Sequence, residues 1–241
     1  MMHLRNLIRS PALPALMMML PSALGDKPET EPGFVSMFNG ENLEGWTVMP
    51  EREAKAWSVK DGLIIGVGGP VRSHLIWHNP NIADFEMKLG YRFPGEGNSG
   101  VNVRARTDDT GKRDFQAYHV DFGHAGIGPN ILGAWDFHTP GRTEHRCFRG
   151  DRLVIDENDN ATITPIDNAV TLNDIRDKDW NDVHIIVRDN HFQYFINGRP
   201  ASEFTEHLPP ERRLPAGMIQ LQLHDPGMVV HFKNIRLKIL K

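Results

Sequence analysis

The chain has 241 residues, of which 39% are hydrophobic and 24% are charged, and its formal net charge is −4. This length and apolar content suit one large β domain with a sizeable core. The slightly acidic balance disfavours nucleic acid and anionic membrane surfaces as partners. Because Cys147 is the single cysteine, an intrachain disulfide is excluded, and we expect a buried structural thiol.

Residues 1–25 have the pattern of a secretory signal peptide. Two arginines precede a short apolar run over residues 12–20, and small residues precede Asp26, where cleavage is expected. The apolar run is too short to span a bilayer. We therefore expect a secreted or periplasmic protein without a membrane span, the alternative being a disordered leader.

The rest of the chain consists of short strand-like runs separated by turn signals. Residues 26–33 are a polar, proline-rich linker, and a single domain is expected over 34–241. Expected strands or strand pairs cover 34–40, 56–68, 83–93, 97–106, 115–123, 180–204, 216–225 and 229–240. Asp-Gly, Pro-Gly and Asn-Gly turns separate many of them. The pattern predicts an all-β protein, an antiparallel β-sandwich.

Two features of the middle of the chain bear on topology. The runs over 83–93 and 97–106 are joined by a Pro94-Gly95 turn, so we expect them to be antiparallel neighbours. Residues 123–150 are rich in glycine and histidine and show no sustained period. A loop of that length in a compact domain is usually functional or disordered.

Three strands carry unusual polar side chains on the face opposite their apolar one. The set is Asn102 and Arg104, then His119 and Asp121, then Gln220, Gln222 and His224, with Glu86 on the strand over 83–93 as a possible extension. A polar outer face is ordinary for an antiparallel strand, but such faces favour Lys, Glu and Thr. Amide and guanidinium groups offer fixed donor and acceptor geometry for sugar hydroxyls. The three strands are therefore predicted to line one groove that binds a carbohydrate.

His119 and Asp121 are two residues apart on one strand, so both side chains point the same way. This spacing suits a pair of metal ligands, or a base with an orienting carboxylate, and His224 could supply a third group. The other histidines are weaker candidates, expected to be structural in the long loop (His124, His138, His145) or on the surface (His74, His78). Glu86 and Asp121 are the only plausible carboxylate pair for a classical glycosidase.

Five segments, taken in order, carry a family resemblance. They read GFVSMFNGENLEGWTV, WSVKDGLIIG, DFEMKLGYRFPGEGNSGVNVRA, WNDVHIIVRDNHFQYFING and MIQLQLHDPGMVVHFKNIRLKIL. From about Phe34 to Leu240 the chain resembles the 3-keto-disaccharide hydrolase family. The resemblance implies a concanavalin A-like β-sandwich, or jelly roll. It also implies action, with a divalent metal ion, on glycosides already oxidised at C3, as 3-keto-glucoside 1,2-lyase or 3-keto-2-hydroxy-glucal hydratase.

The resemblance also extends to single positions. Asn98 and Arg104 match the family's GNSGV strand and the arginine that follows, and His224 matches its GLQLH strand. The strand between them usually reads YEVQI, whereas this chain reads YHVDF. His119 and Asp121 thus replace a glutamate and a glutamine, so this chain departs from the family inside the expected site.

The implied reaction assigns a role to each candidate residue. A ketone at C3 acidifies the hydrogen at C2, so a base can remove that proton while the substituent at C1 leaves. We expect His119 or His224 as the base and Arg104 at the keto oxygen or a hydroxyl. Expected metal ligands are His119, Asp121 and His224, and expected substrate-binding residues are Asn98, Asn102, Gln220, Gln222 and Glu86.

Two alternatives follow from the same pattern. A secreted, lectin-like carbohydrate-binding module would have this fold without catalysis, and Trp77 and Trp135 could then serve as stacking platforms. A glycosidase of unoxidised glucans is disfavoured because no clear pair of carboxylates is present.

Overall fold

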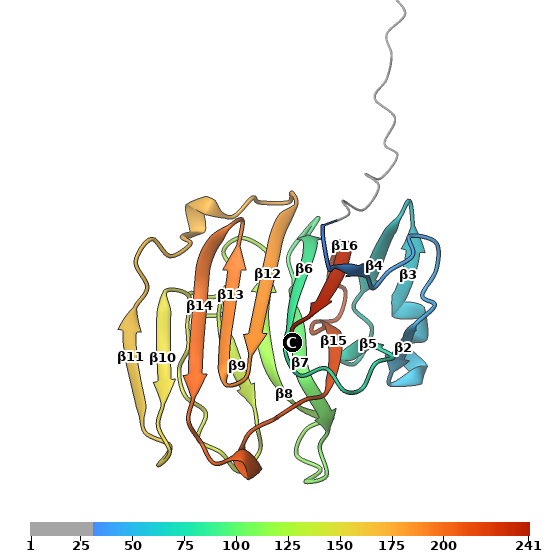
Figure 1. Cartoon of the computed structure of the whole chain (residues 1–241). Helices are drawn as coiled ribbons and strands as arrows, with labels where there is room; N and C mark the ends of the chain where they lie inside the picture. Colours follow the sequence, from blue (N-terminus) through green and yellow to red (C-terminus); the bar gives the residue numbers. More distant parts are fainter. Residues whose placement is uncertain (1–30) are drawn as a thin grey trace, which may run out of the picture.

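The computed structural model describes residues 31–241 as two sheets packed face to face (Figure 1). The predicted signal peptide over 1–25 and most of the 26–33 linker lie outside the described residues. In the described part of the chain, no helix combines the length and the apolar character needed to cross a membrane.

The larger sheet, sheet A, has ten strands within residues 31–241. They are β1 (Val35–Ser36), β3 (Trp57–Lys60), β4 (Leu63–Val67), β6 (Phe85–Arg92), β10 (Asp151–Ile155), β11 (Ala161–Pro165), β12 (Asn181–Arg188), β13 (His191–Ile196), β14 (Arg199–Glu206) and β16 (Val229–Ile239). Their order across the sheet is β11-β10-β14-β13-β12-β6-β16-β4-β3, and β1 pairs with β16. All pairs are antiparallel except β10 with β14.

The smaller sheet, sheet B, lies behind sheet A in Figure 1 and has six strands within the same residues. They are β2 (Trp46–Met49), β5 (Ser73–Trp77), β7 (Asn98–Thr107), β8 (Phe115–Gly123), β9 (Trp135–His138) and β15 (Met218–Leu223). Their order is β2-β5-β15-β7-β8-β9. Short 3-10 helices are η1 (Glu51–Ala56), η2 (Leu172–Asp174) and η3 (Pro210–Arg212).

Alternating apolar side chains fill the space between the sheets, which confirms the predicted all-β sandwich. The buried set includes Phe85, Met87, Leu89 and Tyr91 of β6 and Tyr118, Val120 and Phe122 of β8. Rings meet across the interface, since Tyr118 of sheet B lies 4.7 Å from Phe192 of sheet A, centroid to centroid. Phe192 in turn stacks on Phe204 at 4.2 Å.

The predicted pairing of the runs over 83–93 and 97–106 is wrong. β6 pairs with β12 and β16 in sheet A, whereas β7 pairs with β15 and β8 in sheet B. The Pro94-Gly95 turn therefore crosses between sheets, and Phe93 stays buried at the crossing. Each strand has one apolar face whether the two strands pair as a hairpin or lie in different sheets. The alternation of apolar residues could therefore not distinguish a hairpin turn from a connection between the sheets. The predicted loop over 123–150 also contains a strand, β9.

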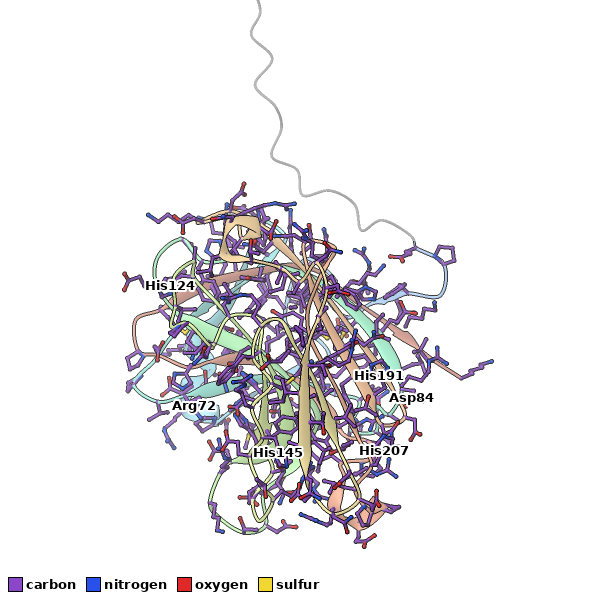
Figure 2. The ribbon with its side chains drawn as sticks, turned by 90° about the vertical axis from the view of Figure 1, so that its left-hand side faces the viewer. Arg72, Asp84, His124, His145, His191 and His207 are labelled. Atoms are coloured by element: carbon purple, nitrogen blue, oxygen red, sulfur yellow. The ribbon has the colours of Figure 1, made fainter. Side chains whose placement is uncertain are left out.

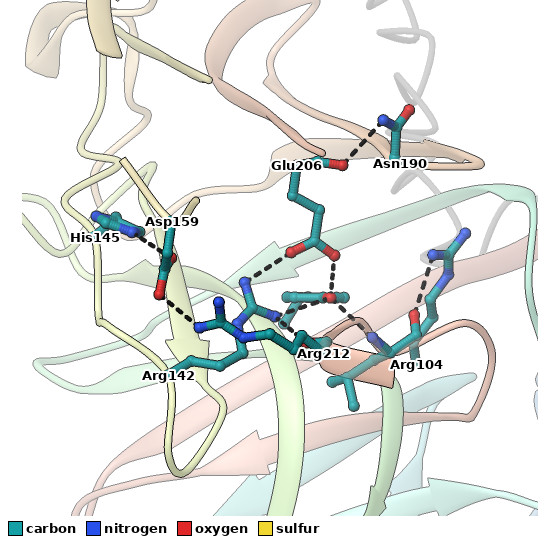
Figure 3. A network of polar contacts seen from close by, with 9 residues as sticks. Arg104, Arg142, His145, Asp159, Asn190, Glu206 and Arg212 are labelled. Atoms are coloured by element: carbon teal, nitrogen blue, oxygen red, sulfur yellow. Dashed lines mark hydrogen bonds and ion pairs between the residues drawn. The ribbon is translucent and has the colours of Figure 1, made fainter. Parts of the chain in front are cut away.

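A buried ionic network ties the two sheets together at one end (Figure 3). The carboxylate of Glu206, at the end of β14, is fully buried, and its Oε2 lies 2.7 Å from Nη2 of Arg142. Its Oε1 accepts a hydrogen bond from the hydroxyl of Tyr118 on β8. Burial raises the pKa of Tyr118, so the phenol keeps its proton and remains a donor. The hydroxyl oxygen also accepts a bond from the Leu214 amide at 3.0 Å.

We predict that Arg142→Met lowers the free energy of unfolding by about 3–5 kcal/mol, because it leaves the Glu206 carboxylate buried without its cation. Urea denaturation measures the change. The double variant Arg142→Met/Glu206→Gln should recover part of the loss, since the charge is gone. The exposed pair Arg176–Asp182 is the matched control, and Arg176→Met should cost less than about 1 kcal/mol. Equal effects of the two single variants would contradict the prediction.

Candidate functional site

The outer face of sheet B carries a layer of polar side chains that the strand register aligns. In the register, His119 and Gln220 lie on either side of Asn102, and Asp121 and Gln222 lie on either side of Gly100. The neighbouring strands add His74 opposite Gln222 and Asp136 opposite His119. Five of the predicted residues, Asn102, His119, Asp121, Gln220 and Gln222, are thus brought together.

This polar layer is buried, unlike an ordinary solvent face. Gln220 is 0% exposed, Asn102 1% and His119 2%. The predicted open groove is therefore covered in this structure. A buried polar group without a hydrogen bond lowers the stability of the fold by about 1–3 kcal/mol. The side chains of this layer therefore take the orientations that give most of their polar atoms a hydrogen-bond partner.

A chain of hydrogen bonds fixes the orientation of His119. Nδ2 of Asn102 donates to Oε1 of Gln220 at 2.8 Å, which turns the Asn102 carbonyl oxygen toward His119. That oxygen lies 2.6 Å from Nδ1 of His119, so Nδ1 carries the hydrogen. The other ring nitrogen, Nε2, lies 3.2 Å from Oδ1 of Asp121. Both nitrogens of His119 thus face polar side chains of the layer, which fixes the orientation of the ring.

Gly100 makes room for this imidazole. A Cβ atom at that position would lie 2.3 Å from Nε2 of His119 and 2.3 Å from the carbonyl oxygen of Val120. The ring of His119 therefore lies directly over β7, and only glycine permits it there.

A second imidazole, His138 at the end of β9, stacks on His119 with ring centroids 5.0 Å apart. Its Nε2 lies 2.9 Å from Oδ2 of Asp136. Burial alone would raise the pKa of Asp136, but the hydrogen bond from His138 outweighs it and the net pKa is lowered. An ionised carboxylate only accepts, so Nε2 of His138 carries the hydrogen and Nδ1 has the lone pair.

The environment also sets the charge of His138. Burial lowers its pKa more than the Asp136 partner raises it, so the imidazole is neutral at pH 7. Glu144 joins the pair, because its hydrogen bond with Asp136 raises the pKa of Glu144 to about 6. A neutral imidazole with one free nitrogen and an oriented carboxylate is equipped to act as a general base.

A small cavity, called here the inner cavity, lies over this layer. Its lining is Arg72, His74, Asn102, Arg113, Asp114, Phe115, His138 and Gln222. Its volume is about 20 Å³, room for about one water molecule. Within residues 31–241, the buried atoms Gln220 Nε2, Gln222 Oε1 and Asn98 Oδ1 have no hydrogen-bond partner. Of these three residues, Gln222 lines the inner cavity, and its unpaired carbonyl oxygen is suited to binding a polar ligand.

His74, expected on the surface, is a buried wall of the inner cavity. It is 4% exposed and its ring packs edge-on against Phe115, with centroids 5.1 Å apart. Burial lowers the pKa of His74 to about 3, and the nearby positive charge of Arg72 acts in the same direction. The short, mostly apolar strand β5 gave no sequence signal for a site.

The placement predicted for Arg104 is wrong. Its φ is +47°, and the register between β7 and β8 shifts just there, so its side chain leaves the outer face. The guanidinium instead donates to the carbonyl oxygens of Ala83 and Leu214, both at 3.1 Å, and to Asp84 at 3.0 Å. It lies over the ring of Phe192. Figure 2 shows Asp84 on the opposite side of the molecule from Arg72 of the inner cavity.

Glu86 is also misplaced by the sequence prediction. It lies on β6 of sheet A, where Oε2 is 3.3 Å from Nε2 of His184 and Oε1 is 3.3 Å from Nζ of Lys238. Glu86 and Asp121 therefore belong to different sheets and cannot form a glycosidase pair. The error follows directly from the wrong pairing of β6 with β7.

The predicted metal ligands do not converge. His119 and Asp121 meet, but Nδ1 of His224 lies 2.6 Å from Asp225 and its Nε2 accepts from Arg72 at 2.5 Å. Within residues 31–241, no three His, Cys, Asp or Glu side chains are grouped to hold a metal ion. The residues present therefore do not fit the three-ligand site, and no chemical step is derived through a metal.

Two further predictions concern core residues. Cys147 is 1% exposed, and burial raises its pKa, which agrees with the structural thiol that was expected. Trp135 is 2% exposed and packs against Phe192 and Phe204 between the sheets, so it cannot be a stacking platform for a sugar. Trp77 is half-buried.

Solved structures resemble this fold at low sequence identity. A protein from Parabacteroides distasonis with a provisional glycosyl hydrolase name aligns with a TM-score of 0.59 and 20% identity, covering 87% of this chain and 94% of that one. A second such protein from the same organism gives 0.55 and 18%, covering 86% and 99%. A protein with a galectin-like fold from Bacillus subtilis gives 0.51 and 11%, covering 82% and 90%. No curated protein matches significantly.

The family to which the sequence profile assigns this chain supports a carbohydrate-active or carbohydrate-binding protein. The chain belongs to the 3-keto-alpha-glucoside-1,2-lyase-like domain family, whose profile matches residues 33–238. This confirms the family resemblance predicted from the five segments.

We predict that Gly100→Ala destabilises the fold by about 1–3 kcal/mol, because the new methyl group overlaps His119 and the backbone of β8. Urea denaturation measures the loss, and the His119 imidazole resonances in NMR should shift. Gly95→Ala is the matched control, since a Cβ at Gly95 meets nothing within 4 Å. A neutral Gly100→Ala variant would show that the ring does not lie over β7.

The low pKa of His74 predicts acid sensitivity. Between pH 6.5 and about 3 the unfolded state binds a proton that the folded His74 excludes, so stability falls as pH falls through this window. At pH 5 this residue should cost about 2 kcal/mol relative to pH 7. His74→Gln should flatten the dependence of the unfolding free energy on pH, whereas the exposed His78→Gln should leave it unchanged. An unaltered slope in His74→Gln would refute the assignment.

Proposed function

We propose that this protein cleaves 3-keto-glycosides by elimination across C1 and C2 followed by hydration, at the inner cavity and outside the cytoplasm. The observation that supports this most is a neutral, carboxylate-oriented His138 next to cationic side chains and unpaired buried amides. The family to which the chain belongs is named for 3-keto-alpha-glucoside 1,2-lyase chemistry.

The reaction needs a base and a cation at defined places. The C3 ketone acidifies the C2 hydrogen, because the electron pair left behind is delocalised onto the keto oxygen as an enolate. Loss of that proton to a base, with cleavage of the C1–O bond, releases the aglycone as an alcohol once it takes up a proton. Water then adds its hydroxyl to C1 and a proton to C2, so the net change is hydrolysis.

The geometry supports different residues for these roles than the sequence did. Nδ1 of His138 is the proposed base, since His138 lines the inner cavity with Nε2 held by Asp136, whereas His119 is 2% exposed and does not line the cavity. Arg72 and Arg113 line the inner cavity and are the proposed cations at the enolate oxygen, in place of Arg104. Oε1 of Gln222 is free to accept from a ring hydroxyl.

Access to the inner cavity requires side-chain movement. A volume of about 20 Å³ is far smaller than a sugar ring, so the outer wall must open for substrate. Arg72, Arg113 and Asp114 belong to that wall and are exposed, whereas His74, Asn102 and Gln222 are buried. Exposed, flexible side chains can shift without disturbing the hydrogen-bonded layer beneath them.

The lectin-like alternative loses one of its two expected platforms. Trp135 lies in the core, which leaves the half-buried Trp77. The oriented imidazole–carboxylate pair favours catalysis over simple sugar binding. Sugar binding without turnover would therefore contradict the proposed catalytic function.

The test compares a 3-keto-glucoside with its unoxidised parent, with and without a chelator. We predict turnover of the keto substrate alone, and a loss of about 10²–10⁴-fold in kcat for His138→Gln. His207→Gln is the matched control, because His207 is exposed and lies far from Arg72 in Figure 2.

Sugar binding without turnover, or an unchanged kcat in His138→Gln, would contradict the proposal. Loss of activity with the chelator would support the divalent metal predicted from the family resemblance. The metal would then need a set of ligands other than His119, Asp121 and His224, which do not converge. Activity that is unchanged by the chelator would contradict the prediction of a divalent metal.

A further inference from the structure

A second hollow, called here the outer cleft, adjoins the inner cavity. It has a volume of about 420 Å³, within the range of small-molecule sites. Arg72, Asp114 and Phe115 line both spaces, so these three side chains form a shared wall. A ligand that displaced part of this wall would occupy both spaces at once.

The outer cleft differs chemically from the inner cavity. Its lining combines the apolar side chains of Met49, Pro50, Val71 and Phe115 with the polar ones of Arg52, Arg72, Thr107 and Asp114. Met49 is 45% exposed and Val71 38%, and both are among the few large apolar side chains exposed in the described part of the chain. The inner cavity, by contrast, is lined mainly by imidazole, amide and charged groups. Exposed apolar side chains gathered in one concavity commonly mark a binding site.

We infer that the outer cleft is the subsite for the leaving group, and that the substrates are 3-keto-glycosides of apolar alcohols rather than disaccharides. This inference rests on the proposed function, which places the oxidised sugar ring in the inner cavity. The C1 substituent must then leave through the shared wall. The guanidinium groups of Arg52 and Arg72 border the cleft and can lie over the face of an aromatic or flat aglycone.

A second sugar would fit the outer cleft poorly. Hydroxyl groups against the side chains of Met49, Pro50 or Val71 would lose water without gaining a hydrogen bond, and only the side lined by Arg52, Arg72, Thr107 and Asp114 offers partners. An apolar aglycone instead gains by leaving water, at about 0.8 kcal/mol for each buried methylene group. The cleft therefore discriminates by the polarity of the leaving group.

The test uses two 3-keto-glucosides whose leaving alcohols have similar acidity, methyl and cyclohexylmethyl, and a 3-keto-disaccharide. We expect kcat/KM for the cyclohexylmethyl compound to exceed both others by roughly tenfold. The double variant Met49→Ser/Val71→Ser should reduce the cyclohexylmethyl-to-methyl ratio by about fivefold. Val67→Ser is the matched control, because Val67 is 45% exposed on β4, away from the cleft, and should leave the ratio unaltered.

Calorimetric binding of the unoxidised methyl and cyclohexylmethyl glucosides separates this inference from the proposed function. If no keto-glycoside is turned over, the proposed chemistry is wrong. The inference about the outer cleft is still supported if the cyclohexylmethyl glucoside binds more tightly than the methyl glucoside and the double variant abolishes this difference. Equal affinities for the two glucosides, or a preference for the disaccharide, would overturn the inference whatever the turnover.

Discussion

The polar side chains on the outer face of sheet B are buried, and this burial constrains the arrangement of the site. Each buried polar group needs a hydrogen-bond partner within the protein, because water is excluded from it. The amide of Asn102 can bond Gln220 and His119 at once only in one orientation. That orientation fixes the hydrogen on His119, and Asp121 occupies its other nitrogen. The resulting rigid imidazole is the surface on which His138 stacks, so the position of the proposed base depends on the amide two strands away.

Two buried polar networks in this protein differ in where their unpaired atoms lie. Both oxygens of the Glu206 carboxylate have partners, and these partners join the two sheets, so removing one partner would leave a buried charge uncompensated. That network leaves Nε of Arg142 unpaired, whereas the layer on sheet B leaves Oε1 of Gln222 unpaired in a residue that lines the inner cavity. Neither atom adds to stability, but a polar ligand in the cavity could bond Gln222.

The sequence predicted the side-chain alternation well and the sheet assignment poorly. Period-two spacing was enough to place His119 beside Asp121 and to bury Tyr118 on the opposite face. It could not reveal that β6 and β7 belong to different sheets, which misplaced Glu86. It also could not reveal the left-handed backbone at Arg104, because one bulge residue reverses the face that follows. His138 was only a weaker candidate and His74 was expected on the surface, because neither lies in a long alternating run and only the register of β9 and β5 brings them to the site.

The departure from the family pattern on β8 follows from the same constraint. A histidine and an aspartate two residues apart on a strand can reach each other, and here they do, while Asn102 lies at the other ring nitrogen of His119. His119 is also absent from the lining of the inner cavity, so the proposed role of base falls to an imidazole that does line it. His138 meets that requirement because Asp136 holds its other nitrogen, and because burial keeps it neutral. In the proposed mechanism, the edge strand β9 therefore supplies the imidazole that the changed central strand does not.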